Sequence, residues 1–274
     1  KKIALVMKSE NKRELARRLG ISGSSLYYRS KLKIRDQCLE EEIFSVLSEH
    51  PSYGHRRLAI HLGRNKKCIL RVMKKFGIKP YRRRARRPCK PNDLGKHPLN
   101  VANWAKALCP LKRSVLWASD FTYFWFHGRW WYLGTVIDLF NREIVGFSFS
   151  GNHNKELVLA ALQNALENHT APFYLHSDQG SEYQSYAYFD LLKLHGIQAS
   201  FSAKASPWQN GFQESFYSEF KKDLGDTSRF ETLGEFIEAL QLQIHYYNHK
   251  RIHTALKTAP ILFRPLLPTS HKLS

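Results

Sequence analysis

The sequence lacks paired cysteines and long apolar runs. Four cysteines are scattered over 274 residues, at Cys38, Cys68, Cys89 and Cys109, and no two form a C-x-x-C pair. This scatter excludes a zinc ribbon and a disulfide framework, so we interpret all four as reduced thiols. No run of eighteen apolar residues is present, and the apolar stretch near the start is too short for a secretory signal. We therefore expect a cytoplasmic protein without a membrane partner.

Two common catalytic patterns are also missing. The sequence contains no Ser/His/Asp or Cys/His arrangement and no phosphate-binding glycine loop of the Walker type. Their absence argues against hydrolases of acyl groups and against ATP-driven regulators. Hydrophobic residues make up 43% of the chain and aromatic residues 13%. That is enough for a packed core, so we do not expect a disordered chain.

Acidic residues are scarce in one part of the chain. The formal net charge is +20. Residues 1–98 contain 27 Lys and Arg against 8 Asp and Glu, whereas the remainder contains 16 against 15. A polyanion is the natural partner for such a segment, because cations docked on phosphates release condensed counterions. A basic surface that is merely soluble is the alternative.

Two helix-turn-helix outlines follow one another in this basic segment. Residues 14–29 read as two short helices separated at Gly20, and residues 53–76 as two more separated at Gly63. Such helices, apolar on one face and basic on the other, suit a DNA groove or backbone. We predict an all-α helix-turn-helix DNA-binding region over residues 1–80. Its candidate DNA contacts are Arg56, Arg57, Lys66, Lys67 and Arg71.

A basic linker is predicted over residues 81–110. It contains Arg82, Arg83 and Arg84, several prolines and no apolar periodicity. We expect these arginines to lie along DNA phosphates in the bound state, with a plain solvated tether as the alternative.

From about residue 111 the pattern becomes typical of an α/β domain. Strands are predicted at 115–126, 130–138, 143–149, 173–176 and 197–201, and helices at 155–168, 186–194 and from 212 onward. The order β-β-β-α-β-α-β-α is that of an RNase H-like domain, with a mixed sheet between helices. We predict this domain over residues 111–228, followed by a C-terminal helix and tail over 229–274.

Three carboxylates occupy positions that such a fold would bring together. Asp120 lies within the first strand, Asp178 directly follows the fourth, and Glu214 lies early in the last helix of the domain. A carboxylate in an apolar strand is costly unless it meets a cation or a hydrogen-bond donor. Three acids can hold two Mg²⁺ ions about 4 Å apart, with Mn²⁺ as a substitute. Chance spacing with ordinary ion pairs is the alternative.

The spacing and the flanking residues resemble those of a known family. Asp120 and Asp178 are separated by 57 residues, and Asp178 and Glu214 by 35. This is similar to the D,D(35)E signature of retroviral integrases and of the IS3 family of bacterial insertion-sequence transposases. The segments that resemble the transposases' catalytic core are Trp117–Tyr123, Tyr132–Leu133 with Ile137–Gly146, His176–Tyr183, and Asn210–Gly211 with Glu214–Phe216. Their C-terminal motif is resembled by Tyr247, Asn248, Arg251, His253, Leu256, Pro260 and Phe263, and their upstream helical segment by Tyr53–Arg57. Two departures are Asn141, where the family often has Ser, and Ala259 before Pro260.

The resemblance implies a Mg²⁺-dependent DNA recombinase. Such an enzyme recognises the terminal inverted repeats of its element, nicks an end and transfers the 3'-hydroxyl to target DNA. It would be bacterial, associated with the nucleoid, and a homo-oligomer when two ends are joined. By the same resemblance Asp120, Asp178 and Glu214 are the catalytic metal ligands, and Lys221 approaches the substrate, with Lys222 beside it.

Other readings remain open at this stage. The chain could be a DNA-binding repressor, or a remnant with an inactive RNase H-like domain, or a nuclease that cleaves without joining. Asp138 is interpreted as a turn or ion-pair residue, and His176 as either a site residue or a structural one. We interpret the aromatic residues Trp130–Tyr132 as core and sheet-face residues rather than a base-stacking site. We interpret His245, His249 and His253 as a polar helix face that ends in a tail facing DNA or the core, rather than as a metal site.

Overall fold

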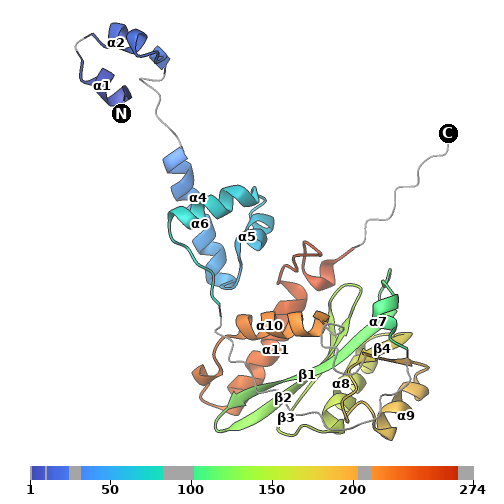
Figure 1. The fold of residues 1–274 in the computed structure, drawn as a ribbon. Helices are drawn as coiled ribbons and strands as arrows, with labels where there is room; N and C mark the ends of the chain where they lie inside the picture. Colours follow the sequence, from blue (N-terminus) through green and yellow to red (C-terminus); the bar gives the residue numbers. More distant parts are fainter. Residues whose placement is uncertain (1, 10, 25–31, 83–101, 203–210, 265–274) are drawn as a thin grey trace, which may run out of the picture.

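A computed structural model of the chain describes residues 2–9, 11–24, 32–82, 102–202 and 211–264 (Figure 1). The second helix of the first outline, most of the basic linker with Arg83 and Arg84, and the loop before Gly211 lie outside these residues. The described chain begins with two groups of helices and continues into one sheet flanked by helices. Within the described residues, no helix is both long and apolar enough to span a membrane.

The first group is a small hairpin of α1 (Lys2–Met7) and α2 (Lys12–Arg18). The side chain of Asn11 caps α2 by accepting the backbone N–H of Glu14 at 3.3 Å. The chain then turns at Gly20, whose φ of +67° suits a residue without a Cβ. The break predicted at this glycine is confirmed.

The second group consists of α4 (Leu32–Glu49), α5 (His55–His61) and α6 (Lys66–Lys75), which pack around one core. The predicted helices on either side of Gly63 are confirmed as α5 and α6, and Gly63 has a φ of +59°. The long helix α4 was not predicted. The core is formed by Leu39, Ile43, Val46, Tyr53, Leu58, Ala59, Ile69, Val72, Met73 and Ile78.

An ion cluster fastens α4 to α6. Asp36 of α4 is almost fully buried, and its carboxylate accepts hydrogen bonds from Arg71 at 2.6 and 2.7 Å and from Lys75 at 2.7 Å. Arg71, a candidate DNA contact, therefore has a partner inside the protein. The two cations lower the pKa of Asp36 well below its usual range by hydrogen bonding to its charged form.

The sheet has five strands in the order β3-β2-β1-β4-β5. They are β1 (Leu116–Phe126), β2 (Arg129–Asp138), β3 (Ile144–Ser150), β4 (Tyr174–Ser177) and β5 (Gln198–Phe201). The first three pair antiparallel, and β4 and β5 continue the sheet in parallel. The predicted mixed sheet is confirmed, with strand ends that differ by one residue at most of the boundaries.

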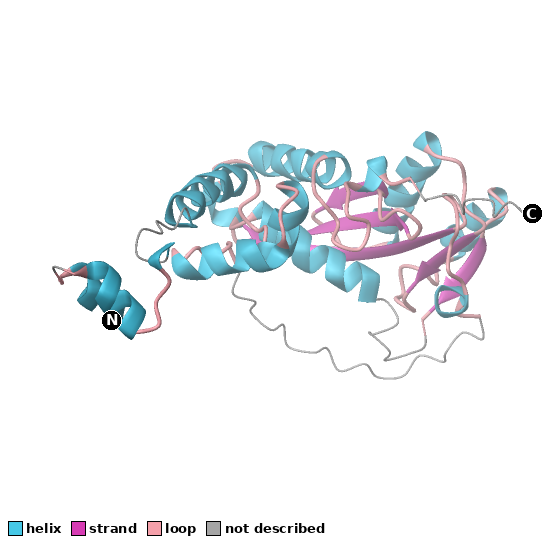
Figure 2. Ribbon diagram, turned by 90° about the horizontal axis from the view of Figure 1, so that it is seen from above, coloured by secondary structure: helices cyan, strands magenta, loops and turns pink. Residues whose placement is uncertain are grey.

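Helices cover both faces of the sheet, as Figure 2 shows from above. One face packs against α8 (Lys155–Asn168) and α9 (Tyr186–Leu194), and the other against α10 (Gly211–Leu224) and α11 (Leu233–His249). The predicted helices at 155–168 and 186–194 are confirmed. The remaining short elements are α7 (Trp104–Ala107), η2 (Thr227–Arg229) and η3 (Pro260–Leu262).

Asp138 closes the turn after β2. Its carboxylate accepts the backbone N–H groups of Ser114 at 2.8 Å and Phe140 at 2.9 Å, and the following Arg142 has a φ of +65°. Burial nevertheless raises the pKa of Asp138. The interpretation of this residue as a turn residue is confirmed.

Candidate active site

The pairing of β1 with β4 brings Asp120 and Asp178 to the same end of the sheet. The two strands run parallel, with Ala118 opposite His176 as the last pair of their register. Asp120 and Asp178 each lie two residues further along, where β4 has just ended and β1 continues. Ligand sites of open α/β sheets characteristically form at the carboxyl ends of parallel strands.

Asp120 shares its surroundings with the other two acids. Burial, the negative charge of Asp178 and, less strongly, that of Glu214 raise the pKa of Asp120 to about 8. The backbone N–H of Phe121 donates to its Oδ1 at 2.8 Å and opposes this shift. The effect of Asp178 and Glu214 places both carboxylates within electrostatic reach of Asp120, which the predicted triad requires.

Asp178 is held by the sharp turn that follows β4. Its Oδ1 accepts the backbone N–H of Gly180 at 3.0 Å. A Cβ on Gly180 would lie 3.0 Å from that oxygen and 2.6 Å from Oε2 of Glu182. The two carboxylates thus crowd the same glycine. Glu182 is buried and also meets Nε2 of His153 at 3.2 Å, and the sequence analysis assigned it no role.

Glu214 lies in the first turn of α10 and is exposed. Two other side chains of α10 bind the helix to the backbone of β1. Nε2 of Gln213 donates to the carbonyl oxygen of Ala118, and the hydroxyl of Tyr217 donates to that of Asp120, both at 2.7 Å. The two residues are one helical turn apart and buried. The sequence analysis missed both, although buried polar residues at this spacing beside a predicted acid were a usable signal.

The three acids do not form a tight cluster. Among the described residues, no group of three His, Cys, Asp or Glu side chains is close enough together to hold a metal ion. The charge of Glu214 still acts on Asp120, although it is the weakest of the contributions to the raised pKa. The metal cage therefore stays a prediction.

The two predicted basic residues of α10 have different environments. Nζ of Lys221 donates to the carbonyl oxygen of Tyr123 at 2.8 Å and lies 4.9 Å from the centre of that ring. Nζ of Lys222 donates to Glu219 at 2.7 Å. Lys221 therefore contacts β1 at Tyr123, which is three residues after Asp120 along the strand. Its approach to a bound phosphate stays a prediction.

The predicted DNA contacts of the helical region divide into two groups. Arg56, Lys66, Lys67 and Arg82 are exposed. Arg57 pairs with Glu219 at 2.8 Å, and Arg71 pairs with Asp36. The exposed group is available to a phosphate backbone, whereas the paired arginines are engaged with carboxylates of the protein.

The remaining histidine candidates are structural. His176 is buried, its Nδ1 lies 2.9 Å from Oγ of Ser200, and burial lowers its pKa to about 4. The rings of His245 and His249 stack at 4.1 Å, and the backbone N–H of His253 donates to Thr258. His245 and His249 lie on α11, which ends at His249, so the predicted polar helix face includes these two, whereas His253 lies in the tail beyond the helix.

The aromatic residues of β2 are sheet-face residues, as expected. Trp131 stacks on Phe149 with ring centres 5.2 Å apart. Trp130 is 46% exposed and meets Tyr123 and Trp125 edge-on across the hairpin.

Comparison with known proteins adds an independent line of argument. Two models described as Integrase core domain match the chain, over residues 111–207 and residues 195–260. The InsK protein of insertion sequence element IS150, from Escherichia coli strain K12, is 33% identical over 267 residues, which cover 92% of each chain. The transposase of insertion sequence element IS904, from Lactococcus lactis subsp. lactis strain IL1403, is 33% identical over 245 residues, covering 83% of this chain and 93% of that relative.

A solved structure is similar in fold. An integrase chain in the cryoEM structure of the simian T-cell lymphotropic virus intasome, in complex with PP2A regulatory subunit B56 gamma, has a TM-score of 0.53 and 17% sequence identity. The match covers 82% of this chain and 76% of that chain. The predicted RNase H-like fold is confirmed.

Proposed function

This chain belongs to the IS3 family of insertion-sequence transposases, and we propose that Asp120, Asp178 and Glu214 are the residues with which it cuts and joins DNA. It is a DNA transposase, an enzyme of the polynucleotidyl transferase class. The relatives do not favour the alternative of a repressor or inactive remnant. The observation that carries the proposal is the parallel pairing of β1 with β4, which brings Asp120 and Asp178 to the same end of the sheet, where Gln213 and Tyr217 also anchor the helix that carries Glu214.

A divalent metal fits this set of side chains. All three residues offer the hard oxygen donors that Mg²⁺ prefers. Desolvation and, after it, repulsion from Asp178 and Glu214 raise the pKa of Asp120, and a cation near Asp120 and Asp178 would offset that repulsion. We therefore propose Asp120, Asp178 and Glu214 as ligands of two Mg²⁺ ions, with Mn²⁺ as a substitute. When bound, the ions would supply charge neutralisation at the attacking and leaving oxygens.

The other residues of the site supply position. Gln213 and Tyr217 hold the start of α10, the helix that carries Glu214, against β1 at Ala118 and Asp120. We propose that the ammonium group of Lys221, close to Tyr123, donates to a phosphate of the bound strand. Because catalysis of phosphoryl transfer depends mainly on positioning and electrostatics, these contacts matter to the rate.

We propose that the DNA partners are the terminal inverted repeats of the element and a target duplex. Arg56, Lys66, Lys67 and Arg82 are the exposed basic residues proposed to contact phosphates, with Arg83 and Arg84 further along the chain. Arg57 and Arg71 would contact DNA only by exchanging their carboxylate partners for phosphates. Joining two ends requires a homo-oligomer on DNA, and the place of action is the bacterial cytoplasm, at the nucleoid.

The test is Asp120→Asn, assayed with Mg²⁺ and a duplex that carries the terminal repeats of the encoding element. We expect end cleavage and strand transfer to fall by roughly a thousandfold or more, because one acidic ligand is lost. The dissociation constant for DNA should stay within about tenfold, because the basic helical region is unchanged. Asp190→Asn, at an exposed acid of α9, is the matched control and should keep both activities.

The same assay separates the alternatives. Strand transfer retained by Asp120→Asn would reject the assignment of the triad. DNA binding by the unaltered protein without nicking would favour a repressor, and cleavage without joining would favour a nuclease.

A further inference from the structure

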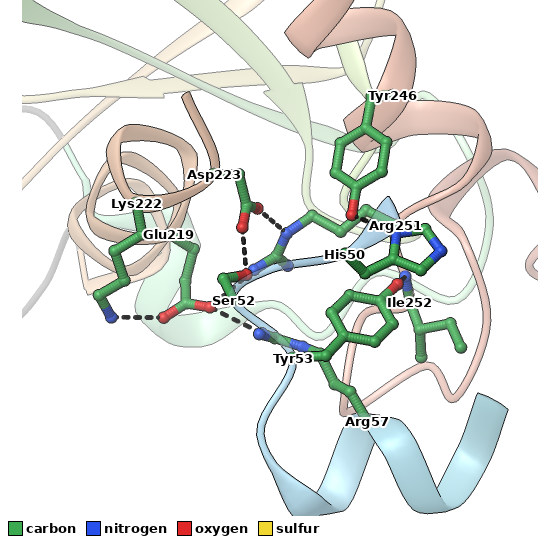
Figure 3. Close-up of polar contacts among 10 residues, drawn as sticks. All are labelled: His50, Ser52, Tyr53, Arg57, Glu219, Lys222, Asp223, Tyr246, Arg251 and Ile252. Atoms are coloured by element: carbon green, nitrogen blue, oxygen red, sulfur yellow. Dashed lines mark hydrogen bonds and ion pairs between the residues drawn. The ribbon is translucent and has the colours of Figure 1, made fainter. Parts of the chain in front are cut away.

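The helical unit α4–α6 and the catalytic domain are joined by a cluster of partly buried polar contacts (Figure 3). Its centre is a pair of acids on α10, Glu219 and Asp223. Arg57 of α5 meets Oε2 of Glu219 at 2.8 Å, and Arg251 meets the same oxygen at 2.7 Å. Arg251 also pairs with Asp223, which accepts the hydroxyl of Ser52. We call these five residues the clasp.

The clasp is well shielded from water. The side chain of Arg251 is 2% exposed and that of Arg57 is 16% exposed. Ion pairs of this kind keep much of their strength because water does not screen them, and the loss of one partner leaves a charge that is poorly compensated. Arg57 therefore has a larger role inside the protein than an exposed cation would have.

Aromatic contacts extend the clasp on one side. The hydroxyl of Tyr53, a fully buried residue, accepts the backbone N–H of Ile252 at 2.8 Å. Nδ1 of His50 lies 2.7 Å from the hydroxyl of Tyr246 on α11, and the rings of His50 and Tyr53 stack at 4.4 Å. The junction thus includes directed hydrogen bonds as well as charge.

The clasp acts on the helix that carries Glu214. Residues 213 and 217 of α10 face β1, and residues 219 and 223, also one turn apart, face the helical unit. Glu214 is five residues before Glu219, which is about 7.5 Å along the helix axis at 1.5 Å per residue. A shift of α10 at the clasp would therefore move Glu214 relative to Asp120.

We propose that Arg57 and Tyr53 are positioning residues. Arg57 holds α10 through Glu219, and Tyr53 holds the chain at Ile252, next to the Arg251 that pairs with both acids of α10, so together they fix the position of Glu214 relative to Asp120 and Asp178. This inference rests on the proposed catalytic role of Glu214. It assigns the Tyr53–Arg57 motif to a junction within the protein, whereas the basic sequence pattern favoured direct DNA contact. The neighbouring Arg56, which is exposed, remains on the side that faces solvent.

The test compares Arg57→Gln, Glu219→Gln and the double variant with Arg64→Gln. Arg64 pairs with Glu42 inside the same helical unit and does not reach α10, so it is a matched control. In the metal-free full chain, we expect Arg57→Gln and Glu219→Gln to speed amide hydrogen exchange in α10 by about tenfold. The control should change this exchange by less than twofold.

Activity and binding provide the second readout. At saturating DNA, strand transfer by Arg57→Gln should fall by about tenfold, while the dissociation constant and its salt dependence stay within about twofold. The double variant should lose no more than Glu219→Gln alone, because the pair with Arg57 is one of the interactions that the loss of Glu219 already removes. Arg57→Lys, which keeps a charge opposite Glu219, should recover part of the rate, and Tyr53→Phe should raise α10 exchange independently of charge.

The outcomes that would overturn the proposal are distinct. The proposal would be wrong if Arg57→Gln lowered DNA affinity tenfold, reduced its salt dependence and left hydrogen exchange in α10 unchanged. That combination is what the loss of a phosphate contact would produce. Additive losses in the double variant would also overturn it. Hydrogen exchange is measured without DNA cleavage or joining. It therefore tests the role of Arg57 even if the Asp120→Asn assay rejects the proposed catalytic triad.

Discussion

At the scale of single residues, two acids of this protein have pKa values shifted in opposite directions. Asp36 is buried and faces two cations, which lower its pKa. Asp120 is half-buried, and desolvation together with the negative charges of Asp178 and Glu214 raises its pKa to about 8. An arrangement that brings like charges together is costly for the folded chain, so it indicates a site built for a cation rather than for stability.

Gly180 provides a test of this site at the residue scale. We expect Gly180→Ala to lower strand transfer by at least about tenfold, because its Cβ would displace the carboxylates of Asp178 and Glu182. The unfolding free energy should change by less than about 1 kcal/mol, since flexible side chains can move aside. Urea unfolding and the strand-transfer assay measure the two effects. A fully active variant would show that Asp178 does not need its present position.

At the scale of elements, α10 joins the sheet through side chains that reach backbone groups. Tyr217 is buried, and its hydroxyl lies 2.7 Å from both Oγ1 of Thr135 and the carbonyl oxygen of Asp120. The apolar residues of α10, Phe216, Phe220 and Leu224, belong to the core shared with α11. The polar contacts thus set the position of α10 along β1, while the apolar contacts supply most of the free energy that holds the helix on the sheet.

We expect Tyr217→Phe to lower the unfolding free energy by about 1–3 kcal/mol, because the carbonyl oxygen of Asp120 loses its donor and the buried hydroxyl of Thr135 loses its acceptor. Tyr186→Phe is the matched control, since Tyr186 is 91% exposed, and it should be neutral. Urea unfolding of both variants measures the difference. Equal stability of the two variants would mean that the hydroxyl of Tyr217 does not stabilise the packing of α10 on the sheet.

Helix α8 lies unusually close to β3 at Gly146. A Cβ there would lie 2.5 Å from both the carbonyl oxygen of Ala161 and the Cβ of Ala165. We expect Gly146→Ala to cost about 1–3 kcal/mol or more, because the backbone of a packed helix must shift. Gly234→Ala, whose Cβ would lie 3.8 Å from Oγ1 of Thr232, should be neutral, and thermal unfolding of both variants measures the difference. A neutral Gly146→Ala would show that α8 moves freely.

At the scale of the whole molecule, charge and stability are distributed differently. The excess positive charge lies in the first third of the chain, whereas two acids of α10 join that third to the catalytic domain. Burial alone would raise the pKa of Glu219, but Lys222, Arg57 and Arg251 lower it to about 2. The clasp therefore stabilises the junction only while Glu219 is ionised.

This shift predicts the pH dependence of the junction. Because the folded-state pKa of Glu219 lies below its ordinary value of 4.5, its contribution is complete above about pH 5 and is lost as the pH falls toward 2. Glu219→Gln should therefore be less stable than the parent at pH 6 to 7, and the difference should shrink toward pH 3. Urea unfolding at several pH values measures it. A difference that does not vary with pH would contradict the ionised pairing.

Much of the catalytic domain could be predicted because its strands and helices have clear periods of about 2 and 3.6 residues. Helix α4 could not, because its apolar residues lie on more than one side. Leu39 and Ile43 are buried, but Ile34 is 66% exposed and Phe44 is 53% exposed, while Asp36 is buried. Such a helix has no clear stripe. The predicted acids were found from spacing and flanking residues, which local sequence carries.

The sequence by itself determined the order of the elements, the three acids and the excess of positive charge. Only the tertiary structure decided which polar side chains hold α10. Gln213 and its acceptor on β1 are 95 residues apart, and Tyr53 and Ile252 are 199 apart. Periodicity reports the face of one element, because it depends on neighbours along the chain. Pairing between distant elements depends on how they pack. The sequence therefore predicted Arg57 as a DNA contact, whereas in the folded chain it pairs with Glu219.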